Sequence, residues 1–177
     1  MGRNRYGEMT CSIARTMEVV GDAWAPLVLR DVALGITRFD VLQRDLGVSR
    51  KVLSRRLDDL VESGVLTAVP YQHNPPRHDY LLTEKGADLV TVLIAMQRWG
   101  DRWVFGEGGA PVVLRHEGCG AATAAVLTCA ACGEELRPGE VTALPGPGLR
   151  DGPGTFEAAP RVRANAERLH PSESPLG

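Results

Sequence analysis

The sequence has no long hydrophobic run and no excess of positive charge. None of its segments reaches the roughly 18 consecutive apolar residues typical of a membrane span, so we expect no membrane helix. The N-terminal stretch MGRNRYGEMTCS lacks the apolar centre of a secretory signal, which favours a cytoplasmic protein. The formal net charge is −2, which excludes a protein that coats nucleic acid through overall basicity. Any surface that binds nucleic acid must therefore be a local cluster of basic side chains.

Catalytic motifs are lacking as well. The chain contains no glycine-rich phosphate loop, no H-E-x-x-H motif and no serine nucleophile elbow, and its histidines are scattered. A catalytic zinc would need an open coordination position and a general base, for which only proximity in the sequence nominates Glu117 or Glu134. We therefore expect a protein that is not an enzyme.

Hydrophobic spacing predicts four helices in the first part of the chain. They fall at 11–21, 24–35, 37–47 and 49–64, and each ends at a glycine. Asp22 and Thr37 precede the second and third helices and are candidate N-caps. The third and fourth helices are joined by a tight link at 47–48, which is typical of a helix-turn-helix.

A hairpin and a long helix are predicted next. The strand-like segments VLTAVPY and HDYLLT bracket QHNPP, whose turn residues indicate a β-hairpin with a proline-rich, basic tip. The segment 83–104 reads as a helix that is apolar on more than one side. We expect one side to pack on its own domain and the other on a second subunit.

The composition changes after Phe105, which divides the chain. Residues 112–144 hold three of the four cysteines and short strand-like pieces, and predict a small zinc-ribbon-like segment. Residues 145–177 are dominated by proline, glycine and charge, and predict a disordered tail, while polar residues 1–10 predict a flexible N-terminus. The domain at 11–105 should be mainly α-helical with a small β-hairpin, followed by a small, cysteine-containing, β-rich C-terminal extension.

The helix at 49–64 carries its charges in an order that its own macrodipole disfavours. Basic residues occupy its first half and acidic residues its second half. Each charge placed this way destabilises the helix by about 0.3–1 kcal/mol through its interaction with the macrodipole. One interpretation is a solvated face with ion pairs one turn apart, although Lys51 and Arg55 would then repel each other. The other interpretation is that a polyanion compensates the basic end.

The context favours the polyanion. Leu53, Leu57 and Leu60 share one side of this helix, so the basic residues lie exposed near its N-terminus. The second helix of a helix-turn-helix enters the major groove with its N-terminal residues at the base edges, and phosphate contacts release counterions. Arg77 lies near the hairpin tip, where it can reach the DNA backbone or the minor groove.

Three segments in order carry a family resemblance over roughly 11–104. CSIARTMEVVGDAWAPLVLRDV, RFDVLQRDLGVSRKVLSRRLDDLVESGVL and PPRHDYLLTEKG resemble the HxlR-type branch of the MarR-like winged helix-turn-helix transcriptional regulators. The resemblance implies a sequence-specific regulator, expected to be a repressor, that binds a palindromic double-stranded DNA operator. It also implies a homodimer formed through the N-terminal helix and the helix at 83–104. The predicted DNA-contacting residues are Arg38, Ser49, Arg50, Lys51, Ser54, Arg55, Arg56 and Arg77.

Cys11 stands where some members of that family carry a cysteine that responds to oxidants or electrophiles. A helix N-terminus and Arg15 one turn away would favour a reactive thiolate there. The alternative is a small buried hydrophobic side chain at the start of a helix. Ser12 departs from the family, which often has proline after this cysteine, and the residues identify no effector.

The late cysteines form two similar motifs. His116-x-x-Cys119 and Cys129-x-x-Cys132 are each followed by glycine, which lets backbone N–H groups turn toward thiolates. In a reducing compartment, four such ligands suit a structural tetrahedral zinc better than disulfides. The alternatives are a metal-free ribbon whose thiols merely pack, and a ribbon that serves mainly as a protein-interaction module.

Overall fold

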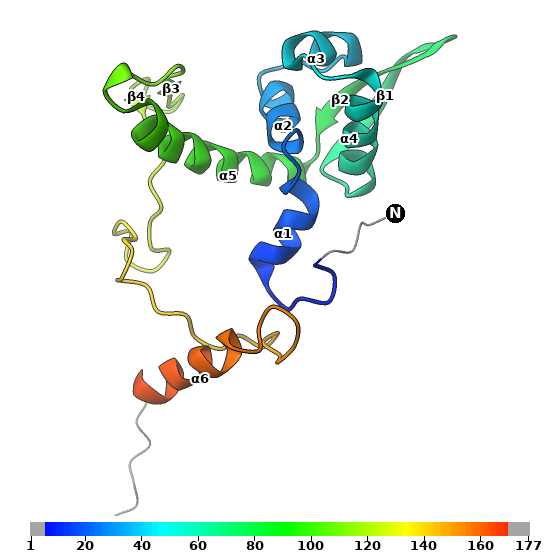
Figure 1. Ribbon diagram of the computed structural model, residues 1–177. Coiled ribbons are helices and arrows are strands. Elements are labelled where there is room, and N and C mark those ends of the chain that lie inside the picture. The colour runs from blue at the N-terminus through cyan, green and yellow to red at the C-terminus, as the bar shows by residue number, and fades with distance from the viewer. Residues whose placement is uncertain (1–5, 170–177) are drawn as a thin grey trace, which may run out of the picture. The chain divides into compact units, whose positions relative to one another are not determined.

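Helices dominate the computed structural model, which describes residues 6–169 (Figure 1). The described residues divide into one unit of residues 22–126 and a second unit that combines residues 6–21 with residues 127–169. Among the described residues, no helix combines the length and apolarity that crossing a bilayer requires. The predicted fold class, mainly α-helical with a small antiparallel hairpin, is confirmed.

The unit of residues 22–126 contains a winged helix-turn-helix. Three helices precede a two-stranded antiparallel hairpin, and a long helix follows it. This helix continues into a π-helical turn and a short 3-10 turn, after which two two-residue strands pair. In chain order the elements are α2 (Ala25–Ala33), α3 (Phe39–Leu46), α4 (Arg50–Glu62), β1 (Leu66–His73), β2 (Pro76–Leu82), α5 (Glu84–Gly100), η1 (Asp101–Phe105), η2 (Gly106–Gly108), β3 (Leu114–Arg115) and β4 (Ala122–Thr123).

The core of this unit is built from the inner faces of α2, α3 and α4. The predicted stripe on α4 is confirmed, because Leu53, Leu57 and Leu60 are all buried. Their four- and three-residue spacing keeps them on one side of the helix. The remaining buried apolar side chains of this unit are Ala25, Val28, Leu29, Val32, Leu42, Val48, Val65 and Leu66.

The helix boundaries agree with the sequence except at two caps. Gly47 ends α3 in the left-handed conformation at φ 62°, and the Ser49 hydroxyl caps α4 by accepting from the Val52 N–H at 3.4 Å. The N-cap of α3 is Arg38, so the prediction that Thr37 caps this helix is wrong. The Thr37 hydroxyl instead donates to the Asp79 carboxylate at 2.8 Å, because the hairpin lies beside it. Asp22, the predicted cap of α2, is likewise not its N-cap, which is Trp24.

The hairpin is anchored at its base, beside α3. Tyr80 N–H donates to the Thr37 carbonyl at 2.8 Å, and Arg38 forms an antiparallel bridge with Asp79. Strand β1 bulges between Pro70 and Gln72, which suits a proline that has no N–H to contribute to the ladder. We call this hairpin, residues 66–82, the wing.

Helix α5 makes a close backbone contact with residues 64–65, just before the wing. Thr83 caps it by accepting from the Gly86 N–H at 3.1 Å, and the same hydroxyl donates to the Gly64 carbonyl at 2.7 Å. Gly86 is buried, and a Cβ added there would lie 2.3 Å from the Val65 carbonyl oxygen. No residue with a side chain fits at position 86 without displacing the backbone.

The second unit contains α1 (Ser12–Val20) and α6 (Ala158–Leu169). Residues 6–10 form a turn before α1, while residues 1–5 of the predicted flexible N-terminus lie outside the described residues. Between residues 106 and 169, regular β-structure is limited to β3, β4 and a single bridge between Thr128 and Glu135. The predicted ribbon segment therefore contains fewer strand residues than its composition indicates.

Helix α6 differs from the sequence-based expectation. Disorder was predicted for 145–177, but residues 158–169 form a helix with Ala159 buried, so this prediction is wrong there. The segment AAPRVRANAERL is rich in strong helix formers, and its proline falls in the first turn, where it is tolerated. Arg163 also pairs with Asp151 at 2.9 Å. Residues 170–177 of the predicted tail lie outside the described residues.

Candidate nucleic-acid interface

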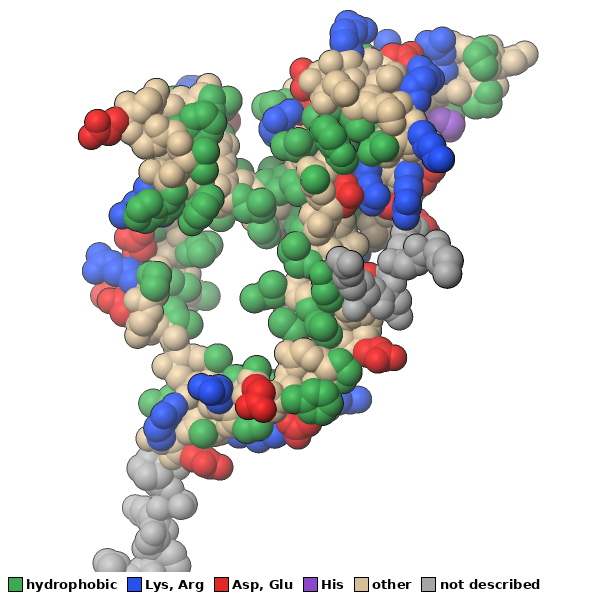
Figure 2. Space-filling model, in the orientation of Figure 1, with side chains coloured by type: hydrophobic (Ala, Val, Ile, Leu, Met, Phe, Trp, Pro, Cys, Tyr) green, Lys and Arg blue, Asp and Glu red, His purple; other side chains and the backbone are tan. Residues whose placement is uncertain are grey.

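A basic surface covers the exposed sides of α3, α4 and the wing. We define the basic face by Arg38, Arg50, Lys51, Arg55 and Arg77, all of which are exposed. Figure 2 shows Lys and Arg side chains gathered over this lobe of the molecule. The sequence predicted each of these residues as a DNA contact, and the structure brings them together on neighbouring elements.

Helix α4 supplies the centre of the basic face. Lys51, Ser54 and Arg55 are exposed on the side opposite the buried leucines. Ser49, also predicted as a DNA contact, uses its hydroxyl as the cap of this helix and remains exposed. The backbone N–H groups of the first turn add partial positive charge at the same end.

Arg56 does not belong to the basic face. Its side chain is only 19% exposed, and its guanidinium pairs with Asp22 at 3.0 Å and with Asp59 at 2.8 Å. It therefore connects α4 to the residues before α2. That Arg56 contacts DNA stays a prediction, and helical periodicity alone did not reveal the two carboxylates that hold its guanidinium.

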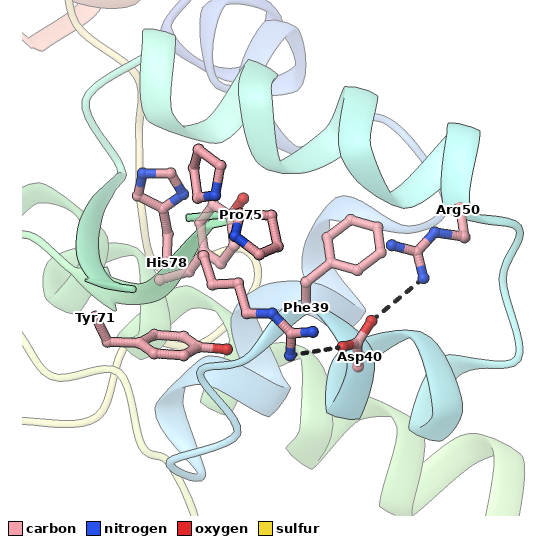
Figure 3. A pocket seen from close by; sticks show the side chains of 9 residues that line it. Phe39, Asp40, Arg50, Tyr71, Pro75 and His78 are labelled. Carbon is pink, nitrogen blue, oxygen red and sulfur yellow. Dashed lines mark hydrogen bonds and ion pairs between the residues drawn. The ribbon is translucent and has the colours of Figure 1, made fainter. Parts of the chain in front are cut away.

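One carboxylate connects two arginines of the basic face. Asp40, in the first turn of α3, lies 3.3 Å from Arg50 Nη1 through Oδ1 and 3.8 Å from Arg77 Nη1 through Oδ2 (Figure 3). The Arg50 guanidinium also lies over the Phe39 ring, 4.9 Å from its centroid. The sequence analysis missed Asp40, since an acid in the first turn of a helix is an ordinary response to the macrodipole.

A hollow of about 320 Å³ separates the wing from α3 and the start of α4. The Arg38 guanidinium lies over the ring of Tyr71, one of the lining residues, 4.6 Å from its centroid, while Arg38 Nε is 3.5 Å from Asp79. Burial, and secondarily the charge of Asp58, raises the pKa of the Tyr80 phenol. The lining residues are Phe39, Asp40, Arg50, Tyr71, Pro75, Pro76, Arg77, His78 and Tyr80.

Each predicted metal-binding motif forms a similar turn within its own unit. In the first, Gly120 N–H donates to the His116 carbonyl at 2.7 Å, and His116 Nδ1 lies 3.3 Å from Cys119 Sγ. In the second, Gly133 N–H donates to the Cys129 carbonyl at 2.8 Å. Both glycines have positive φ, 73° and 78°, as the sequence motif requires.

The second turn also directs backbone N–H groups at a sulfur atom. Hydrogen bonds from the backbone of Cys132 and Ala131, and then from the Cys132 side chain, lower the pKa of the Cys129 thiol. Within residues 6–169, however, no three His, Cys, Asp or Glu side chains assemble as a metal site. A zinc ion held by His116, Cys119, Cys129 and Cys132 therefore stays a prediction.

Cys11 is the N-cap residue of α1 and is partly exposed. Its side chain makes no capping hydrogen bond. This position is compatible with reaction at the thiol, but it equally suits a small residue at a helix start. Redox or electrophile sensing through Cys11 stays a prediction.

Comparisons with known proteins concern the same part of the chain. A family model described as HxlR-like helix-turn-helix matches residues 19–107. An uncharacterized HTH-type transcriptional regulator of Mycobacterium tuberculosis (strain H37Rv) is 43% identical over 139 residues, covering 78% of this chain and 88% of that protein. This alignment is longer than the family match, so the relative shares sequence beyond the winged helix.

Two solved structures have similar folds. PA1607, a candidate transcription factor, is 34% identical with a TM-score of 0.65, over 73% of this chain and 91% of that one. PA1374 of Pseudomonas aeruginosa, also described as a candidate transcription factor, is 35% identical with a TM-score of 0.57, over 80% of this chain and 96% of that one.

Proposed function

Because the chain belongs to the HxlR-like helix-turn-helix family, we propose that this transcriptional regulator is a repressor that binds a palindromic operator as a homodimer. As a member of this family it is a DNA-binding regulator and not an enzyme. The proposal assigns residues to DNA binding and to dimerisation, and it gives the direction of regulation. Repression needs only that the bound dimer occupies promoter DNA.

The observation that carries the proposal is the separation of the two sides of α4. Leu53, Leu57 and Leu60 are buried, whereas Lys51 and Arg55 are exposed near the N-terminus. This places a basic helix end outward, as insertion into a major groove requires. In the proposed complex Lys51, Ser54 and Arg55 meet base edges and nearby phosphates.

The wing and the start of α3 supply the flanking contacts. Arg77 lies near the wing tip with half of its side chain exposed, and Arg38 precedes α3. In the proposed complex Arg77 contacts the backbone or a narrow minor groove next to the site of α4. Contacts of this kind position the protein on the duplex, and the base contacts of α4 specify the sequence.

Exposed apolar side chains support dimerisation. On α5, Val92, Met96 and Trp99 are exposed at spacings of four and three residues, and Trp99 is 63% exposed. On α1, Ile13 and Met17 are exposed one turn apart. Large apolar side chains in a row at helical spacing are characteristic of interface cores. A two-fold dimer would present two copies of α4 to successive major grooves on one side of DNA.

Arginine substitution on and off the basic face tests the DNA assignment. Arg55→Ala should weaken binding to the DNA upstream of the protein's own coding sequence by about tenfold and reduce the salt slope by roughly one. Arg161→Ala removes the same charge from an exposed position on α6 and should change affinity by less than about twofold. Fluorescence anisotropy at several salt concentrations measures both. Equal affinities in the two variants would reject the assigned face.

A charged substitution on α5 tests the dimer. Trp99→Lys should convert a dimer into monomers in sedimentation velocity and abolish tight operator binding, because burying a lysine in an apolar interface is unfavourable. Val141→Lys introduces the same charge at an exposed valine of the extension and should remain dimeric. A wild-type protein that sediments as a monomer while binding its operator would overturn this part of the proposal.

A further inference from the structure

We propose that Asp40 is a positioning residue that determines the preference of the basic face for its operator over other DNA. Its carboxylate holds Arg50 and Arg77 in the absence of DNA and keeps them from binding phosphates indiscriminately. The proposal rests on the DNA-binding function proposed above. It concerns how much the protein prefers one sequence, and not whether it binds DNA.

The geometry brings together charges from three separate elements. Asp40 comes from the first turn of α3, Arg50 begins α4, and Arg77 lies on β2 close to the wing tip. Each carboxylate oxygen of Asp40 lies near one arginine, at 3.3 Å from Arg50 and 3.8 Å from Arg77 (Figure 3). The two arginines therefore share one internal anion.

All three side chains remain accessible to a duplex. The exposed fractions are 70% for Arg50, 51% for Arg77 and 54% for Asp40. Ion pairs this exposed are weak, so DNA can rearrange them on binding. A phosphate that approaches these arginines nevertheless meets the negative charge of Asp40, which reduces the electrostatic attraction on which non-specific binding depends.

Asp40 affects a contact between Arg50 and a base edge differently from a contact with a phosphate. Arg50 contacts Asp40 through Nη1, and the guanidinium carries other N–H donors that can reach a guanine in the groove. Asp40 on one side and the Phe39 ring on the other restrict the orientation of Arg50. An orientation that is fixed before binding reduces the entropy lost when the base contact forms. Asp40 thus disfavours phosphate contacts and favours a directed base contact.

Asp40→Asn tests this with little change in shape. Affinity is measured for a duplex from upstream of the protein's own coding sequence and for a scrambled duplex of equal length, over a range of salt. We expect the variant to bind the scrambled duplex about threefold to tenfold more tightly, with a steeper salt slope and no gain for the upstream duplex. The ratio of the two affinities then falls by the same factor.

Asp45→Asn is the matched control. Asp45 lies on the same helix with similar exposure and pairs with Arg30 at 3.4 Å, away from Arg50 and Arg77. Both variants gain one unit of net charge, so a general electrostatic effect appears equally in both. Equal changes in the two variants, or an unchanged affinity ratio in Asp40→Asn, would overturn the proposal.

Repeating the Asp40→Asn substitution in the Arg50→Ala variant shows whether Asp40 acts through Arg50. In Arg50→Ala, adding Asp40→Asn should alter the affinity ratio by less than half as much, on a logarithmic scale, as it does in the wild type. A full effect without Arg50 would reject the positioning role. A wild-type protein with no preference between the two duplexes would instead contradict the proposed function, so the two failures are distinguishable.

Discussion

The winged helix and the C-terminal extension are stabilised in different ways. Among the described residues, all but one of the buried apolar side chains lie between Ala25 and Leu66, and the exception is Ala159 in α6. In the extension, side chains such as Leu127 and Val141 are exposed. Its local order comes from backbone hydrogen bonds in two glycine-containing turns and from isolated polar contacts. Burial specifies the first region, whereas short-range backbone geometry specifies the second.

This difference has a functional consequence. The helices that carry the basic face pack on a buried apolar core, so the backbone positions of its basic residues are well defined. The extension has no comparable layer of apolar contacts within the described residues. A ligand that contributes bonds of its own, such as a metal ion, has more to add there than in the winged helix.

The same substitution in both regions gives the largest expected contrast. Leu57→Ala should lower the free energy of unfolding by about 2–5 kcal/mol, because Leu57 is fully buried on the inner side of α4. Leu127→Ala, at an exposed leucine of the extension, should change it by less than about 0.5 kcal/mol. Urea unfolding followed by tryptophan fluorescence measures both. A similar loss in both variants would remove the distinction between the regions.

Two glycines of α5, Gly86 and Gly100, allow a tightly packed and an open position to be compared within one helix. Gly86→Ala should lower the free energy of unfolding by about 1–3 kcal/mol, because the added Cβ would collide with the Val65 carbonyl. Gly100→Ala meets no neighbouring atom and should stabilise the protein by about 0.5–1 kcal/mol through reduced chain entropy. Opposite signs in thermal unfolding support this account, and a stabilising Gly86→Ala would contradict it.

Metal removal should have the smallest effect on the winged helix. If the predicted zinc site forms, the purified protein contains about one zinc per chain. Cys129→Ser should then lose the metal, whereas Cys11→Ser should keep it. Removing zinc should make the extension more sensitive to protease while the unfolding midpoint of the winged helix stays within about 1 °C. Elemental analysis decides the first point, and protein purified without zinc would reject the site.

The sequence predicted the winged helix well because its signals are periodic. The spacing of Leu53, Leu57 and Leu60 predicted both the helix and its buried side. Turn residues around Pro75 located the wing, and Thr83 correctly marked the start of α5. Local patterns of this kind need no knowledge of the neighbouring elements.

Tertiary contacts account for what the sequence did not predict. In the sequence Arg56 resembles its basic neighbours, but in the structure it pairs with Asp22, more than thirty positions earlier in the chain. Asp40 looked like an ordinary helix-start acid, and its two arginine partners come from other elements. Helix α6 was not predicted, because the proline and glycine of the surrounding tail indicated disorder despite a short run of helix formers. Pairings between distant positions carry no periodic signal in a single sequence.

The absence of a side chain at position 86 also bears on signalling. Because Gly86 is buried against Val65, the residue just before the wing, the backbone of α5 meets the base of the wing with no side chain between them. A tilt of α5 would therefore move the base of the wing together with the helix. If α5 pairs with a second copy as proposed, a rotation of one protomer against the other would then also move the two wings.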